Sequence, residues 1–149
     1  MIINVIDIMQ SANGEIVKEF EYNASNDLIV SLPEGAFATP VKVKAALWLE
    51  EKKVLADIEL TYTISSACSR CLDSAICEVK HNYFAKYSLN PEEGEYLYKS
   101  GRVDLTTSVN EEIILSQPTV IYCKPDCKGL CLVCGANLNK GDCGHNNND

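Results

Sequence analysis

The 149-residue chain has few of the residues that acid–base catalysis uses, because it holds only two histidines, His81 and His145. Neither one begins the H-x-E pattern of nucleobase deaminases or the H-E-x-x-H pattern of zinc proteases. A catalytic zinc site also needs an open position and a nearby general base. We therefore expect a protein that is not an enzyme.

Long apolar runs are also missing, since none approaches the roughly 18 residues of a membrane-spanning helix. The first ten residues, MIINVIDIMQ, contain Asp7 and lack the basic region and cleavage site of a signal peptide. These absences predict a cytoplasmic protein. In a reducing compartment, clustered cysteines bind metal more often than they form disulfides.

Positive charge is scarce, with 13 Lys and Arg against 21 Asp and Glu and a net charge of −8. Residues 1–118 carry the whole deficit, with 10 basic and 18 acidic side chains, whereas residues 119–149 carry three of each. An acidic body is repelled by phosphate backbones, which disfavours charge-driven binding of nucleic acid. It favours a basic protein as the partner.

Alternating apolar and polar residues predict strands over 41–50, 54–64 and 75–87, and a looser alternation predicts one over 15–22. The sequence EEKK separates the first two of these runs, which indicates an antiparallel hairpin. Three consecutive strands predict an antiparallel sheet or a partly open barrel. The stretch 88–101 has the composition of a loop.

The period then changes in VDLTTSVNEEIILSQP, where apolar residues recur every four positions from Leu105 to Ile113. Asp104 or Thr106 is a candidate N-cap, and Pro118 ends the run. This predicts one helix packed on the sheet. The fold class is then α+β.

Cysteines dominate the end of the chain, with five in the 23 residues CKPDCKGLCLVCGANLNKGDCGH, 123–145. The sequence CLVCG has the form of a zinc knuckle, and CSRC repeats the Cys-x-x-Cys spacing directly after the second predicted strand. Eight candidate zinc ligands result: Cys68, Cys71, Cys123, Cys127, Cys131, Cys134, Cys143 and His145. We expect an antiparallel β domain over 1–118 and a zinc-ribbon-like tail over 119–149, with one or two structural Zn²⁺ ions.

Two pairings of these ligands remain open, because tetrahedral zinc needs four. In the first, Cys131 and Cys134 form a local ribbon with two of Cys123, Cys127 and Cys143, which leaves Cys68 and Cys71 for another role. In the second, Cys68 and Cys71 meet Cys131 and Cys134, and the remaining four ligands form another site.

Other interpretations of single residues are weaker. The CSRC pair follows a hairpin rather than opening a helix, so a thiol redox role is the lesser alternative. Cys77 and His81 share the apolar parity of their strand, which favours packing over ligation. Trp48 lies on the polar parity and is either a contact under the helix or an exposed interaction residue.

A zinc ribbon that binds nucleic acid directly is the main alternative function. It would need a basic face with aromatic residues between the charges. The candidate contacts are Arg70, Lys124, Lys128 and Lys140, with Tyr122 as the aromatic residue.

The segments CSRCL, VDLTTSVNEEIILSQP and CKPDCKGLCLVCGANLN, in this order, resemble the YceD family. Members are small bacterial and plastid proteins associated with accumulation of large-subunit ribosomal RNA. Their genes commonly lie beside that of a small basic large-subunit ribosomal protein. The resemblance implies a non-enzymatic role in large-subunit assembly, through a ribosomal protein or the RNA, with neither a membrane nor a small-molecule substrate.

The resemblance also carries over motif residues. These are Cys68, Arg70, Cys71, Cys123, Cys127, Gly129, Leu130, Cys131, Cys134, Gly135, Asn137, Leu138, Asn139 and Cys143. Many members end in Cys-x-Cys, where this chain has Cys143-Gly144-His145. Imidazole can replace a thiolate on zinc, so a ligand role for His145 is retained.

Overall fold

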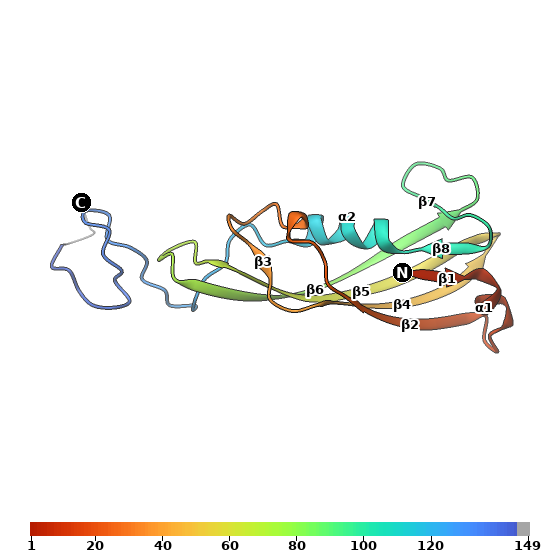
Figure 1. The fold of residues 1–149 in the computed structure, drawn as a ribbon, viewed down its shortest axis with the longest axis horizontal. Coiled ribbons are helices and arrows are strands. Elements are labelled where there is room, and N and C mark those ends of the chain that lie inside the picture. The colour runs from red at the N-terminus through yellow and green to blue at the C-terminus, as the bar shows by residue number, and fades with distance from the viewer. Residues whose placement is uncertain (146–149) are drawn as a thin grey trace.

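Four long antiparallel strands form the body of the protein in this computed structural model, which describes residues 1–145. They are β2 (Glu15–Tyr22), β4 (Val41–Glu50), β5 (Lys53–Ala67) and β6 (Ser74–Ser88). The sheet order is β2-β4-β5-β6-β7, with β7 (Tyr96–Leu97) parallel to the end of β6 and β3 (Ala36–Phe37) paired with β5. Figure 1 shows a long twisted sheet with a helix along one face.

The two faces of the sheet differ because side chains alternate along a strand. On the helix side, Val43 in β4 and Ile58 and Leu60 in β5 are fully buried. On the other side, Lys42 and Lys44 alternate with these residues and are exposed. We call this second side the open face, since Figure 1 shows no element packed on it.

Helix α2 (Thr106–Ser116) covers the opposite face with Val109 and Ile113, both fully buried. Its buried Ser108 Oγ lies 3.1 Å from the hydroxyl of Tyr83 and 2.6 Å from that of Tyr87. The hydroxyl of Tyr62 likewise lies 2.9 Å from Ser116 Oγ. These hydrogen bonds satisfy polar groups that burial would otherwise penalise.

The N-terminal segment completes the fold beside the sheet. Strand β1 (Ile2–Asn4) pairs antiparallel with β8 (Arg102–Asp104), and helix α1 (Val5–Gln10) follows at once. A 3₁₀ turn, η1 (Asn26–Leu28), lies against α2. The Gln117 side chain, directly after α2, links the helix to η1 by donating to the carbonyl of Leu28.

The strands expected over 15–22, 41–50, 54–64 and 75–87 are all present, as is the late helix. Of the two architectures expected, the structure has the open sheet, because β2 and β7 end the strand order and do not pair. The hairpin turns on Glu51 and Lys52, both with positive φ, as a type I′ turn requires. The stretch 88–101 was predicted as a loop but contains β7.

After α2 ends at Ser116, the chain runs past the β5–β6 turn. Residues 119–145 project from one end of the sheet (Figure 1). This segment has no helix, and its sole ladder contact in the described part is a bridge between Leu130 and Asn137. No helix within residues 1–145 is long and apolar enough to cross a bilayer.

Candidate metal centres

Two groups of four potential metal ligands lie at the tail end of the molecule. The first group is Cys68, Cys71, Cys123 and Cys127, and the second is Cys131, Cys134, Cys143 and His145. Within each group the ligand atoms all lie within 4.8 Å of one another. We call them the inner cluster and the outer cluster.

The inner cluster joins the β5–β6 turn to the tail. In the turn, the Cys68 amide donates to the Asp73 carbonyl at 2.7 Å and the Leu72 amide donates to the Cys68 carbonyl at 3.0 Å. Leu72 takes a left-handed φ of 63° to close it. The Arg70 amide then points at the Cys68 sulfur, 3.5 Å away, as in a zinc knuckle.

The tail is tied to this turn by bonds that do not involve cysteine. The Ser69 amide donates to the Ile121 carbonyl at 2.8 Å, and the Ile121 amide donates back to Ser69 Oγ at 3.1 Å. Arg70 donates from Nη1 to the Cys127 carbonyl at 3.2 Å, with its guanidinium 4.4 Å from the centre of the Tyr122 ring. The two cysteine pairs of the inner cluster are therefore brought together by their neighbours.

Gly129 and Asn139 shape the turn that follows Cys127. Gly129 has a φ of +76°, and a Cβ there would lie 3.3 Å from the Arg70 carbonyl oxygen, so glycine fits both the conformation and the space. Asn139 accepts from the Lys128 amide at 2.9 Å, and its Nδ2 lies 3.4 Å from the Cys127 sulfur. A donor at that sulfur stabilises a thiolate.

The outer cluster forms locally in the tail. The Cys131 amide donates to the Ala136 carbonyl and the Gly135 amide donates to the Cys131 carbonyl, both at 2.8 Å, which closes the second knuckle. Only Cys131 is buried there, while Cys134 and His145 are exposed. In the inner cluster three of the four cysteines are buried.

Two sulfur–sulfur distances in the inner cluster are close to those of a tetrahedral zinc site. The sulfurs of Cys68 and Cys127 are 3.8 Å apart, and those of Cys71 and Cys123 are 3.5 Å apart. Zn–S bonds of about 2.3 Å give a tetrahedron with edges of about 3.8 Å, whereas a disulfide needs about 2.05 Å. Each of the two groups of four could hold one metal ion.

Electrostatics within the inner cluster favour a cation. Burial raises the pKa of Cys68, but amide donors from Arg70, Cys123 and Cys71 outweigh it and lower the pKa to about 6. Burial and the neighbouring Cys71 thiol raise the pKa of Cys123 to about 12. Without a cation, some thiols in the group ionise readily and others resist, because thiolates this close repel one another.

The outer cluster also contains a cysteine whose pKa is lowered. Amide donors from Cys134 and Val133 lower the pKa of Cys131 to about 6, with burial opposing them. One ligand of this group is therefore a ready thiolate near neutral pH, which is the form that binds metal.

The structure groups the eight predicted ligands in a third way, which neither expected pairing contains. Cys131 and Cys134 meet Cys143 and His145 rather than Cys123, Cys127 or the CSRC pair. After the positive φ of Gly129, the backbone bonds of the CLVCG knuckle are local, since the Cys131 amide donates to Ala136 and the Gly135 amide donates to Cys131. The knuckle therefore closes on the residues that follow it.

The other residues singled out by sequence lie outside both groups. Cys77 is half-buried on β6. The Nε2 atom of His81 lies 2.9 Å from Oε2 of Glu112 in α2. Trp48 lies on the open face, where its ring centre is 5.9 Å from that of Phe84. The helix covers the other side, so a contact under the helix was the wrong alternative for Trp48.

Among the predicted partner contacts, Arg70 is occupied within the inner cluster, and Lys140 forms an ion pair with Asp73 at 3.1 Å. Lys124 and Lys128 are exposed. Sequence reasoning gave no role to Ser69 or Asp73, and it considered Tyr122 only as an aromatic residue for binding RNA. Their contacts join residues more than 50 positions apart, and no local pattern signals such contacts.

The comparison with protein families finds a match over the part of the chain that holds the two clusters. The family described as large ribosomal RNA subunit accumulation protein YceD matches residues 56–149, a range that includes both clusters and α2. No curated protein and no solved structure matches the chain. Because the match covers more than half of its length, the chain belongs to the YceD family.

Proposed function

We propose that the protein is a non-enzymatic factor that supports assembly of the large ribosomal subunit, or accumulation of its RNA, by binding a basic ribosomal protein. The family match over residues 56–149 carries this proposal, since the family's description names large-subunit RNA accumulation. The choice of a protein partner is supported by charge. A body with a net charge of −8 attracts a basic protein and repels RNA.

We also propose that both clusters hold Zn²⁺, one ion each, in a structural role. Each group supplies four ligands, which completes a tetrahedral shell and leaves no position for a reactive water. When bound, the ions supply the cross-links that fix the tail. The chain's own residues then orient it: Arg70 holds the turn against Tyr122, and Asn139 holds the segment after Cys127.

Direct binding of ribosomal RNA by the tail is the second candidate. The exposed Lys124 and Lys128 beside the inner cluster favour it, but Arg70 and Lys140 make contacts within the protein. Two exposed lysines give little electrostatic affinity for a phosphate backbone.

The test is affinity capture of the tagged protein from its own cells, with and without RNase. We expect a basic large-subunit ribosomal protein to remain after RNase, and zinc to be present at two ions per chain. Loss of every partner with the RNA would favour the second candidate. A Lys124→Glu, Lys128→Glu variant should retain the partner under the first proposal and lose it under the second. Normal levels of large-subunit RNA in cells lacking the protein would overturn both.

A further inference from the structure

Strand β2 forms one edge of the main sheet and has an unpaired side. Its eight residues pair with β4 from Glu15↔Trp48 to Tyr22↔Val41. Within residues 1–145 no other strand pairs with β2, and no backbone hydrogen bond reaches its outer side. Figure 1 shows β2 along the margin of the sheet. A free edge of this kind is a template for an added strand.

The side chains of β2 divide into two rows of different chemistry. The open-face row is Glu15, Val17, Glu19 and Glu21, all exposed. In the other row, Ile16, Phe20 and Tyr22 are half-buried and pack against the edge of the core, while Lys18, between Ile16 and Phe20, is exposed. An added strand would therefore meet carboxylates with one set of its side chains and an incompletely covered apolar margin with the other.

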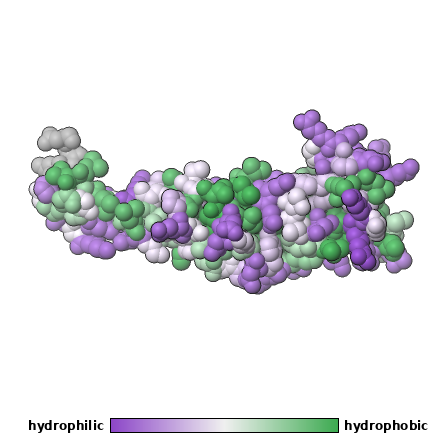
Figure 2. All heavy atoms as spheres, turned by 45° about the horizontal axis from the view of Figure 1, so that its top comes forward, coloured by the Kyte–Doolittle hydropathy of each residue, from purple (hydrophilic) through white to green (hydrophobic). Residues whose placement is uncertain are grey.

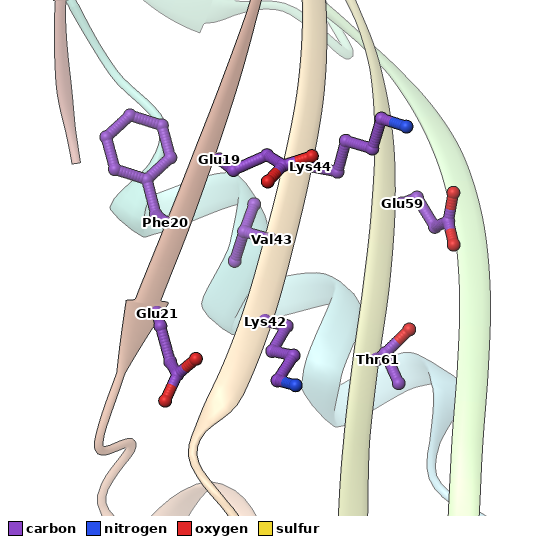
Figure 3. A pocket seen from close by; sticks show the side chains of 8 residues that line it. All are labelled: Glu19, Phe20, Glu21, Lys42, Val43, Lys44, Glu59 and Thr61. Carbon is purple, nitrogen blue, oxygen red and sulfur yellow. The ribbon is translucent and has the colours of Figure 1, made fainter.

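Beside the carboxylate row the open face is hollowed. A depression of about 430 Å³ lies over β2, β4 and β5. Figure 3 shows Lys42 and Lys44 in it, between the glutamates of β2 and Glu59. These lysines are the register partners of Glu21 and Glu19, yet within residues 1–145 neither lysine comes within 4.0 Å of a carboxylate oxygen. The glutamates of β2 therefore remain available to a cation on their outer side.

Charge decides which occupant the edge accepts. A second copy paired through its own β2 would place glutamates opposite glutamates, which is destabilising. A nucleic acid would be repelled by the same row. On the opposite side of the sheet, β7 pairs only with the last two residues of β6, so most of β6 is also an edge. That edge offers no comparable charge selectivity, because its open side carries Lys80 and Lys86 together with Glu78.

We propose that the outer edge of β2 binds an extended, basic segment of a partner protein as an additional strand of the sheet. Lysine or arginine side chains of that segment oppose Glu15, Glu19 and Glu21. Its alternate, apolar side chains extend the cover over Ile16, Phe20 and Tyr22. This inference rests on the proposed function for the identity of the partner as a ribosomal protein and adds the surface and the mode of binding.

The first experiment uses synthetic peptides with blocked ends, because the natural segment is not identified. One peptide alternates lysine and valine, one alternates glutamate and valine, and one has the lysines and valines in two blocks. Amide hydrogen exchange of the full zinc-loaded chain is followed by NMR. We expect the alternating lysine peptide alone to slow exchange in 15–22, at the amides that face away from β4. Unchanged exchange there, or protection of β6 instead, overturns the inference.

A charge-reversed variant, Glu19→Lys with Glu21→Lys, tests the recognition. We expect the lysine peptide to bind about tenfold more weakly, since two favourable cross-strand pairs become unfavourable. We also expect the glutamate peptide to gain binding. The control, Glu78→Lys with Glu93→Lys, changes the net charge equally on β6 and the following loop, and its peptide affinity should stay near that of the wild type. Equal loss in both variants would mean that net charge, and not the edge, binds the peptide.

The test in cells separates this inference from the proposed function. If the wild-type chain restores large-subunit RNA and the Glu19→Lys, Glu21→Lys chain does not, while folding and binding two zinc ions, both stand. If the variant restores it fully, the edge is not the binding surface and only the further inference falls. If the wild-type chain itself has no effect on the RNA, the proposed function falls, while the peptide results still decide the edge.

Discussion

The sheet and the tail of this protein are ordered by different physical means. The sheet buries a continuous core, in which residues such as Val43, Ile58 and Leu60 are fully enclosed. In the tail, residues 119–145, Ile121 is the one aliphatic side chain that is buried. The cysteines Cys127 and Cys131 are buried there as well. About 27 residues with so little buried apolar surface cannot offset their loss of conformational entropy. If the cysteine clusters hold metal as proposed, they order the tail as the apolar core orders the sheet.

The surfaces of the two regions differ as well. Figure 2 shows polar and apolar side chains intermixed along the body, with apolar groups recurring on the projecting end. Leu132 and Val133, which are 84% and 67% exposed, lie between the two cysteines of the outer knuckle. A domain with its own core would bury such residues, so their exposure is a further sign that apolar packing does not hold the tail.

Removing metal should produce the largest difference in stability between the tail and the sheet. We expect a strong zinc chelator to abolish exchange protection and protease resistance over 119–145 while the amides of β4 and β5 remain protected. Structural zinc contributes about 10–16 kcal/mol of apparent binding free energy, which is folding free energy where no site exists beforehand. The measurement is hydrogen exchange by mass spectrometry, before and after chelation. An unchanged proteolysis pattern would show that the tail holds itself.

A substitution in the core should produce the opposite pattern. Ile58→Ala removes a fully buried side chain from β5, and we expect the free energy of unfolding to fall by about 2–5 kcal/mol. Urea unfolding followed by circular dichroism measures this loss. Zinc content should stay at two ions per chain, because Ile58 lies in the sheet away from both clusters. Loss of zinc from a folded variant would mean that the two regions are energetically coupled.

The two regions should also lose stability at opposite ends of the pH scale. The pKa of Cys68 is lowered to about 6, so the stability it contributes is present above the unfolded thiol pKa and is lost as pH falls through 6. Burial raises the pKa of Tyr87 to about 12, so its contribution is present below pH 10 and is lost as pH rises through 12. We expect the tail to be released first in acid, with zinc, and the contact between sheet and helix to weaken first in alkali.

Hydrogen exchange of the tail and near-ultraviolet circular dichroism of the tyrosines would report the two transitions separately. Burial raises the pKa of Tyr83 in the same direction, and this residue shares Ser108 with Tyr87. A Tyr87→Phe variant should therefore keep part of the alkaline transition and leave the acid transition unchanged. A single transition at either end, common to sheet and tail, would contradict the separation of the two regions.

The same division explains what could be predicted from sequence. The core of the sheet was predictable because apolar and polar residues alternate along each strand, as in VKVKAALWLE. Such alternation indicates that one face of the strand is buried. The helix was predictable from its change of period. The short elements β1, β3, β7 and α1 were not, because two to six residues carry no reliable period and form only when a distant partner is present.

In the candidate site, the residues that gather into clusters were predictable and their grouping was not. Cysteine spacing identifies candidate ligands but contains no information about which pairs meet. Here the inner cluster depends on contacts such as Ser69 with Ile121 and Arg70 with Cys127, which cross more than 50 residues of sequence. The division into units at 118 and 119 remains a prediction, because the inner cluster itself takes two ligands from each side of it.

Arg70 offers the finest test, because it lies where sheet and tail meet. Its guanidinium sits 4.4 Å from the centre of the Tyr122 ring and donates to the Cys127 carbonyl. Arg70→Lys keeps the charge but loses the planar group that makes both contacts at once, so we expect the tail to be destabilised by about 1 kcal/mol. Tail amides should exchange several-fold faster, with no change in β4 or β5. Lys128→Arg, on the exposed surface nearby, is the matched control and should have no effect. If Arg70→Lys instead left exchange unchanged and lowered retention of ribosomal RNA in the capture experiment, Arg70 would be a nucleic-acid contact, and the tail would be anchored by metal and backbone contacts alone.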